Sequence, residues 1–155
     1  EVLEVSEWGL KPNWVTGDRW YSSLENLKVL RKQKVGFLFG IANNRKVSIE
    51  RGTSVQVKTV EIPSEGIMVY LKAFGWVKVF CMPFKNEQRY YILYRPDLES
   101  LQQMPRAVFK QVHSEHWQIE CYHRVIKQVC NIERFYVRDE QAIRNHIFCA
   151  LRAFC

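Results

Sequence analysis

The sequence predicts a mixed α/β fold, and three observations along the chain of 155 residues lead to this prediction. A strand, a helix and a second strand follow one another over residues 12–45, which is the order of an α/β unit. Several strand-like segments then occur in a row over residues 53–95, and the pattern is helical over residues 105–155. Because no repeat, low-complexity tract or flexible linker separates these regions, we expect one domain over residues 1–155.

The α/β unit begins with residues 13–16, a short apolar run that predicts a strand. Leucines recur at helical spacing over residues 24–31, and either Ser22 or Ser23 is a suitable N-cap for that helix. Residues 35–40 are again apolar and predict a second buried strand. Strand, helix and strand within about 30 residues therefore form one α/β unit.

A β-rich region follows the α/β unit. Four segments are rich in Val, Ile, Tyr, Phe and Trp and predict strands: residues 53–62, 67–72, 76–82 and 89–95. The turns between them are marked by Gly66, Gly75 and Asn86. Because consecutive strands joined by short turns usually pair with each other, we expect an antiparallel meander of four strands that interrupts the α/β pattern.

The last region of the chain is helical. Pro105 is suited to open a helix near Arg106, and a second periodic stretch covers residues 113–129. Asp139 is a suitable N-cap for a final helix over residues 139–154.

The periodic stretch 113–129 has two different faces on a helical wheel. One arc is apolar and predicts a face packed against a core: Ile119, Tyr122, Val125, Ile126 and Val129. The opposite arc carries one carboxylate among potential cations: His113, His116, Glu120, Arg124 and Lys127. A solvated face in which Glu120 pairs with Arg124 explains such a stripe without any function. A zinc site is a weaker interpretation, because His116 and Glu120 have no third ligand nearby in the sequence.

Composition narrows the classes of partner. The formal net charge of +7 and the pI of about 9.3 suit nucleic acid, although many proteins without such a partner are as basic. No apolar run approaches the roughly 20 residues of a membrane span. The five cysteines are odd in number and form no Cys-x-x-Cys pair, which favours reduced thiols in a cytoplasm over a zinc ribbon or a disulfide framework. The aromatic side chains are expected in the core rather than as platforms for stacking on bases.

Residues 116–127, His-Trp-Gln-Ile-Glu-Cys-Tyr-His-Arg-Val-Ile-Lys, resemble the last catalytic segment of the DDE transposases of bacterial insertion sequences. That family typically shows a Tyr, an Arg three positions later, the catalytic Glu four positions after the Arg, and a Lys seven positions after the Glu. In this chain the same spacing is occupied by His113, His116, Glu120 and Lys127. Glu and Lys match the family, and both other positions hold histidine.

A second, separate segment resembles the same family. Residues 15–23, Val-Thr-Gly-Asp-Arg-Trp-Tyr-Ser-Ser, are similar to the segment around the family's second catalytic Asp, which ends a core strand and precedes a helix. The resemblance therefore assigns Asp18 to the catalytic position; taken alone, it is a residue at the entry to a helix. Residues 37–45 look like the next core strand and its exit loop, and residues 130–135 look like the tail beyond the catalytic helix. The resemblance covers nearly all of residues 12–154.

The resemblance implies a ribonuclease-H-like fold with a β-rich insertion before the helix that carries Glu120. It implies an enzyme that cleaves DNA at transposon ends and joins the ends to target DNA, with Asp18 and Glu120 as catalytic metal ligands. Carboxylate oxygens suit Mg²⁺ or Mn²⁺, and two such ions can serve the attacking and leaving oxygens of a displacement at phosphorus. We therefore expect the two carboxylates within roughly 8 Å of each other.

The same resemblance implies partners and a compartment. Double-stranded DNA, as transposon ends and as target, is expected to contact the stripe mainly through phosphates, at His113, His116 and Lys127. Arg124, whose position is not part of the family motif, is expected to add a further phosphate contact. A dimer on DNA in the bacterial cytoplasm, without a membrane, is the expected assembly. Two other interpretations stay open: a basic domain that binds DNA without cleaving it, and a different ribonuclease-H-like nuclease such as a junction resolvase.

The family's site needs three carboxylates, and the resemblance matches two of them in this chain. The first catalytic Asp of the family lies on a core strand upstream of the segment around Asp18. The residues before that segment include Glu1, Glu4 and Glu7 but no Asp. We therefore expect the chain to be the C-terminal part of such a catalytic domain, with a core incomplete at its N-terminus, and to be inactive alone.

Overall fold

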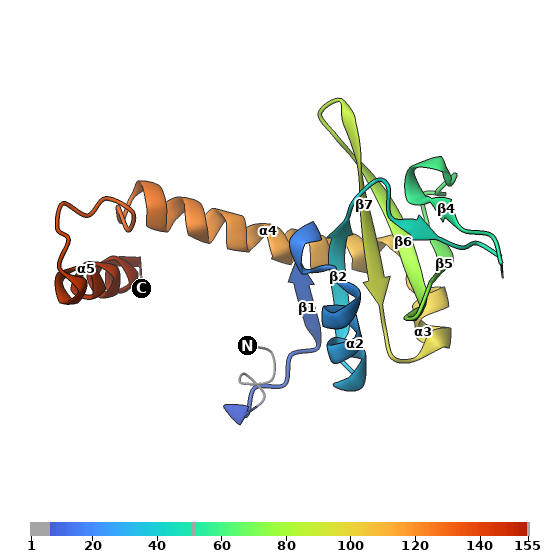
Figure 1. The fold of residues 1–155 in the computed structure, drawn as a ribbon, viewed down its shortest axis with the longest axis horizontal. Helices are drawn as coiled ribbons and strands as arrows, with labels where there is room; N and C mark the ends of the chain where they lie inside the picture. Colours follow the sequence, from blue (N-terminus) through green and yellow to red (C-terminus); the bar gives the residue numbers. More distant parts are fainter. Residues whose placement is uncertain (1–6, 51, 155) are drawn as a thin grey trace. The chain divides into compact units, whose positions relative to one another are not determined.

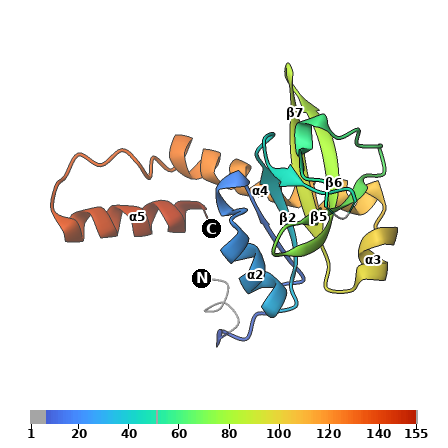
Figure 2. The same cartoon turned by 45° about the vertical axis from the view of Figure 1, so that its right-hand side comes forward.

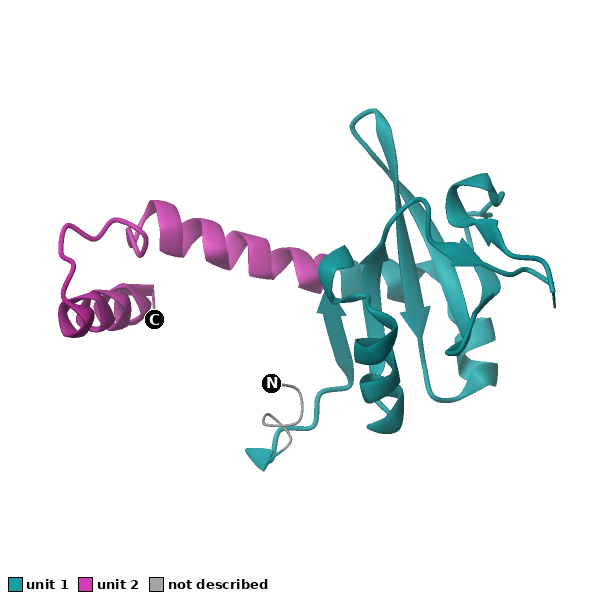
Figure 3. Ribbon diagram, in the orientation of Figure 1, with its two compact units in different colours: residues 1–113 teal, residues 114–155 magenta. Residues whose placement is uncertain are grey.

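The computed structural model describes residues 7–50 and 52–154, which form a mixed α/β structure (Figure 1). The backbone divides into two compact units, residues 1–113 and residues 114–155 (Figure 3). The boundary falls within helix α4 (Arg106–Gln128), which contributes to both units. The single domain expected over the whole chain remains a prediction.

The first unit is built around a five-stranded mixed sheet. Its strands in chain order are β1 (Trp14–Gly17), β2 (Gly36–Ile41), β5 (Ile67–Leu71), β6 (Gly75–Phe84) and β7 (Glu87–Tyr94). In space the order is β1-β2-β7-β6-β5. β1 and β2 are parallel, and the other neighbouring pairs of this sheet are antiparallel. The predicted mixed α/β class is confirmed.

The predicted strand, helix and strand are confirmed as β1, α2 (Leu24–Lys32) and β2. Ser23 rather than Ser22 is the N-cap of α2, because its hydroxyl oxygen accepts a hydrogen bond from the helix backbone. α2 buries Leu27 and Leu30 in a cluster that includes side chains of β2. Since β1 and β2 are parallel, their carboxyl ends lie at the same edge of the sheet.

β5, β6 and β7 confirm the expected antiparallel meander, but they continue the sheet instead of interrupting it. β7 pairs with β2 from Phe37↔Tyr94 to Ile41↔Tyr90. The ribbon formed by β6 and β7 extends beyond the neighbouring strands (Figures 1 and 2). The β-rich region is therefore joined to the α/β unit by a strand pair.

The strand predicted over residues 53–62, the first of the four predicted strands, is wrong over most of its length. That segment contains only the short β4 (Val55–Gln56), followed by a 3-10 turn (Val57–Thr59). β4 pairs with β3 (Lys46–Val47) in a separate two-stranded sheet. The first residue of the turn and Val60 are both buried, and their separation of three residues is the period of a 3-10 turn rather than of a strand.

Both faces of the five-stranded sheet are buried at β2, whose side chains alternate between two hydrophobic clusters. Phe37 belongs to the cluster that contains the leucines of α2, and Leu38 belongs to the other cluster. In the latter, Phe109 of α4 stacks on Phe80 of β6 with ring centroids 4.5 Å apart. α3 (Leu98–Gln103), a short helix without a predicted counterpart, contributes to the same cluster.

Lys78 of β6 is buried and holds the end of α3. Its Nζ donates hydrogen bonds to the carbonyl oxygens of Gln102 and Met104 at 2.9 and 2.8 Å. Burial lowers the pKa of Lys78 below its ordinary value, and the nearby negative charge of Glu65 partly counteracts this shift. The ammonium group thus supplies donors to carbonyls at the end of a helix, where the helix itself leaves them without partners.

The second unit consists of the C-terminal part of α4 and helix α5 (Glu140–Phe154). The first two predicted helical stretches form the single continuous helix α4. Asp139 is the N-cap predicted for α5, and its carboxylate accepts a hydrogen bond of 2.9 Å from the N–H of Ala142. Within the described residues, no helix combines the length and the apolar character needed to cross a bilayer.

The apolar arc predicted as a core-facing seam of α4 is buried only in part. Ile126 is 4% exposed, whereas Ile119, Val125 and Val129 are 44%, 37% and 71% exposed. The expected burial is therefore wrong for these three residues. A pair of helices covers only the strip along which the two helices touch, which is narrower than the arc.

Candidate functional site

Asp18 lies directly after β1, at the edge where the parallel strands β1 and β2 both end. Glycines allow the chain to pack closely here. A Cβ on Gly17 would lie 2.6 Å from a ring carbon of Phe39, and a Cβ on Gly40 would lie 3.4 Å from the backbone nitrogen of Arg19. The turn that begins at Asp18 therefore packs directly against β2.

The turn after Asp18 is a short 3-10 helix (Arg19–Tyr21), and Asp18 is its N-cap. Oδ1 of Asp18 accepts a hydrogen bond of 2.8 Å from the N–H of Trp20. The hydroxyl of Ser22 donates a hydrogen bond of 2.8 Å to the carbonyl of Arg19. An ionised carboxylate has about four acceptor sites, so this exposed side chain can cap the turn and still bind a ligand.

Glu120 is exposed on α4 in the second unit. In the part of the chain that the structure describes, its carboxylate takes part in no hydrogen bond or ion pair. The intrahelical pair with Arg124, which would account for this face without a function, is therefore not formed. The oxygens of Glu120 are accessible to a ligand.

Lys127 is one of the residues expected to contact DNA phosphates. Its Nζ lies 2.6 Å from Oε1 of Glu133, and the two side chains are 52% and 61% exposed. An ion pair as exposed as this contributes little to stability. Lys127 can therefore exchange its partner for a phosphate at small cost.

The two histidines of the stripe lie in different surroundings from the exposed cations. Nε2 of His113 is 3.1 Å from the hydroxyl oxygen of Tyr91, and the two rings meet edge to face with centroids 4.9 Å apart. His113 also contacts the ring of Phe109 in the core of the first unit. His116 is half-buried on α4. Packing explains the position of His113, and the DNA contacts expected for both histidines remain predictions.

Asp18 belongs to the first unit and Glu120 to the second, so the expected approach of their carboxylates remains a prediction. Over residues 7–50 and 52–154, no group of three or more His, Cys, Asp or Glu side chains is arranged to hold one metal ion. The donor chemistry fits all the same, because exposed carboxylate oxygens are the ligands that Mg²⁺ and Mn²⁺ prefer.

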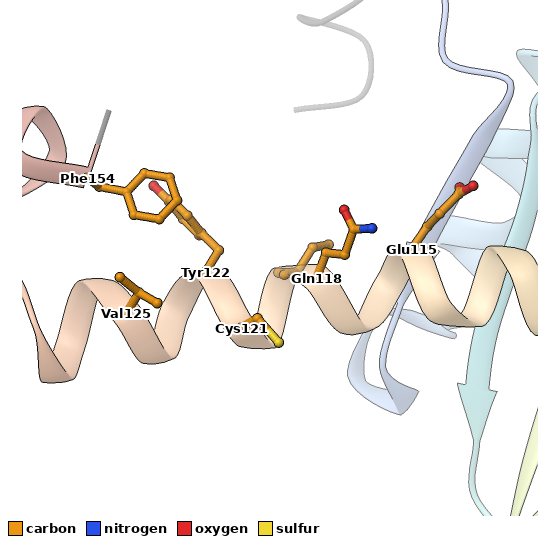
Figure 4. A pocket seen from close by; sticks show the side chains of 7 residues that line it. Glu115, Gln118, Cys121, Tyr122, Val125 and Phe154 are labelled. Atoms are coloured by element: carbon orange, nitrogen blue, oxygen red, sulfur yellow. The ribbon is translucent and has the colours of Figure 1, made fainter.

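Two surface pockets among the described residues have neither Asp18 nor Glu120 in their lining. One, of about 520 Å³, lies in the second unit where Tyr122 and Phe154 meet edge to face with centroids 4.7 Å apart (Figure 4). The other, of about 300 Å³, lies beside the beginning of β1, at the opposite end of that strand from Asp18, and includes Lys34 and Arg95 in its lining. The candidate site therefore consists of exposed carboxylates rather than of a cavity.

Two aromatic side chains beside Asp18 contradict the expectation that aromatic residues belong to the core. Trp20 is 82% exposed and Tyr21 is 59% exposed. Their exposure could have been predicted from the sequence, because both residues lie between two capping residues, Asp18 and Ser23. A residue between two caps has no long helix or strand face to turn inward.

In a comparison with known protein families, residues 2–155 match the family described as Transposase DDE domain. No individual curated protein matches the chain. The family match covers both carboxylate-bearing segments and the β-rich region between them.

Proposed function

The chain belongs to the family of transposases with a DDE domain, and from this premise we propose that Asp18 and Glu120 are two of its three catalytic carboxylates. The family implies a ribonuclease-H-like fold and a DNA transposase function. The proposed reaction is metal-dependent cleavage of DNA at transposon ends, followed by joining of those ends to target DNA.

One observation carries the proposal for Asp18. It is an exposed carboxylate at the edge where two parallel strands end, and a single hydrogen bond of 2.8 Å from the N–H of Trp20 orients it. Ligands in open α/β sheets bind outside the carboxyl ends of the strands. For Glu120 the support is an exposed carboxylate without a partner in the described part of the chain.

The two carboxylates would hold Mg²⁺ or Mn²⁺. When bound, such ions activate the attacking oxygen and stabilise the leaving oxygen of a displacement at phosphorus. The contribution of the chain itself is position and charge. Carboxylates gathered at one site repel each other, and binding of a cation relieves that repulsion.

DNA is proposed to bind along the stripe of α4 through its phosphates. Lys127 and Arg124 are exposed cations on this helix, and the overall net charge is +7. His113 and His116 complete the proposed contact. Self-association on DNA and a cytoplasmic location in a bacterium belong to the same proposal.

The sharpest test asks whether one metal ion contacts both carboxylates. Fe²⁺ with ascorbate and peroxide cleaves a polypeptide close to the bound iron, and mass spectrometry locates the cuts. We expect cuts near Asp18 and near Glu120 in the unmodified chain, and both should weaken when Mg²⁺ or Mn²⁺ competes for the site. Asp18→Asn should remove the cuts near Glu120 as well as those near residue 18, because both depend on the same ion.

Glu99→Gln is the matched control, since Glu99 is an exposed carboxylate on α3 that the proposal places outside the site. It should leave the cleavage pattern unchanged. Cuts near Asp18 that persist in Glu120→Gln, without any near Glu120, would contradict a shared site. A chain that binds DNA but shows no competed cuts would instead be a DNA-binding domain without the chemistry.

A further inference from the structure

The turn from Asp18 to Ser22 presents an indole to solvent next to the candidate catalytic carboxylate. Trp20 is 82% exposed. Within the described residues its ring shows no contact with another ring or with a cation. An indole left in water forgoes the free energy that burial of an aromatic side chain supplies.

The backbone that carries this indole is fixed. The N–H of Trp20 donates to Oδ1 of Asp18 at 2.8 Å, and the N–H of Tyr21 donates to the carbonyl of Asp18 at 3.2 Å. The hydroxyl of Ser22, a buried side chain, donates to the carbonyl of Arg19 at 2.8 Å. Three hydrogen bonds therefore fix the backbone of the turn at Trp20, which reduces the backbone entropy that is lost when a ligand binds to the indole.

Trp20 and its neighbour Tyr21 differ in their surroundings. A Cβ on Gly17 would lie 3.3 Å from Cδ2 of Tyr21, so the tyrosine ring packs over the glycine at the end of β1. The indole of Trp20 is 82% exposed, compared with 59% for the side chain of Tyr21. Trp20 is therefore the side chain of this turn with an open ring face.

The residues beside Trp20 indicate which ligand the exposed face of the indole binds. Asp18 is two residues away and is assigned to the phosphate that reacts, and Arg19 between them is an exposed cation suited to a phosphate. A phosphate bound there brings its own nucleoside within reach of the turn. Base–aromatic stacking tolerates every base, because every base has a π-face. Bases inside a duplex are already stacked on both faces, so a base that stacks on Trp20 has to be unpaired.

We propose that Trp20 is a stacking platform for an unpaired nucleobase of the DNA strand whose phosphate lies at Asp18. This proposal rests on the proposed function, since it takes DNA to be the substrate at Asp18. It adds a residue that binds the strand through a base and makes the site selective for DNA with an unpaired nucleotide. Arg19 holds the backbone of the same strand.

The test uses the 155-residue chain and two short duplexes, one blunt and one with an unpaired overhang that contains 2-aminopurine. Stacking on an indole quenches 2-aminopurine, so quenching reports the contact and titration reports affinity. Trp20→Ala should remove the quenching and weaken binding of the overhang duplex by roughly 5- to 150-fold, the range that corresponds to loss of one stacked base. Binding of the blunt duplex should not change, and Trp20→Phe should retain most of the affinity for the overhang.

Trp117→Ala is the matched control, because Trp117 is also exposed but lies on α4. It should leave the overhang signal intact. If Trp20→Ala binds both duplexes as the unmodified chain does, or weakens both equally, the stacking proposal is overturned while DNA binding stands. If the unmodified chain binds neither duplex, the proposed function fails and the stacking proposal fails with it.

Discussion

Lys127 and Glu133 form an ion pair in which Nζ and Oε1 are 2.6 Å apart, while both side chains remain more than half exposed. The helix α4 and the loop that follows it thus supply a lysine and its carboxylate partner. A surface pair of this kind is worth about 0–1 kcal/mol, so it does not prevent the lysine from binding elsewhere. The pair does, however, place the negative charge of Glu133 beside Lys127, where a DNA phosphate would approach.

Lys127→Ala should reduce the steepness with which DNA affinity falls with salt concentration by about one unit of log Kd per log unit of salt, because one phosphate contact is lost. Glu133→Gln should strengthen binding, because it removes the competing carboxylate. Fluorescence anisotropy titrations of a labelled duplex at several salt concentrations measure both effects. Lys28→Ala serves as control, since Lys28 is exposed on α2 outside the stripe. An equal loss of slope in Lys28→Ala would show that only net charge matters.

The chain of 155 residues should not cleave DNA ends in the presence of Mg²⁺ or Mn²⁺. Two carboxylates leave Mg²⁺ with most of its water, and it is then held loosely. A nuclease assay with the unmodified chain and Glu120→Gln checks this expectation. Robust cleavage that disappears in Glu120→Gln would mean that a carboxylate within these residues, or in a second copy, completes the site.

Gly17→Ala should destabilise the first unit by about 1–3 kcal/mol, because its Cβ would overlap the buried ring of Phe39. Gly40→Ala is the matched control, since its Cβ would meet the Arg19 backbone only at 3.4 Å. Urea denaturation followed by circular dichroism measures both variants. Equal stability of the two variants would contradict the close packing described for the turn.

Lys78→Met should destabilise the fold by about 1–3 kcal/mol, because the carbonyls of Gln102 and Met104 lose their donor. The pKa of Lys78 is lowered by burial, so the unfolded chain binds more protons than the folded chain between the two pKa values. In that alkaline window Lys78 therefore makes a positive contribution to the change of the free energy of unfolding with pH, whereas Cys81, Tyr90 and Tyr94, whose pKa values are raised by burial, contribute in the opposite direction. Lys78→Met should lack the positive contribution and should therefore lose stability more steeply with rising pH than the unmodified chain, whereas Lys58→Met, at an exposed position, should follow the unmodified chain. Denaturation across the alkaline range compares the three proteins.

Local sequence patterns predicted the elements that local interactions determine. Leucine spacing and a serine cap predicted α2, and Asp139 predicted the start of α5. The segment of residues 53–62 misled the prediction, because buried valines in a turn with a period of three resemble part of an alternating strand. The pairing of β7 with β2 had no signal in either strand alone, since it depends on residues far apart in the sequence.

For the candidate site, the predicted order of strands and helices correctly placed Asp18 directly after a strand and Glu120 on a helix. The exposure of Trp20 was not predicted, because its aromatic character favoured the core and its position between two caps was not weighed. The absence of a Glu120–Arg124 pair could not be read from their spacing either. Spacing permits an ion pair of this kind, but the free energies involved are too small to enforce it.

The pairing of β2 with β7 has a consequence for how the protein is made. A ribosome delivers β2 well before β7, and β2 is apolar on both faces. Until Tyr94 has been synthesised, the edge of β2 that pairs with β7 has no partner strand. Apolar strands with an unpaired edge are sites of misassembly. The meander thus protects the α/β unit during synthesis, and removing the meander to obtain a minimal domain should give an insoluble product. Sheets held by contacts distant in the sequence also form slowly, so this interval of exposure is intrinsic to the topology.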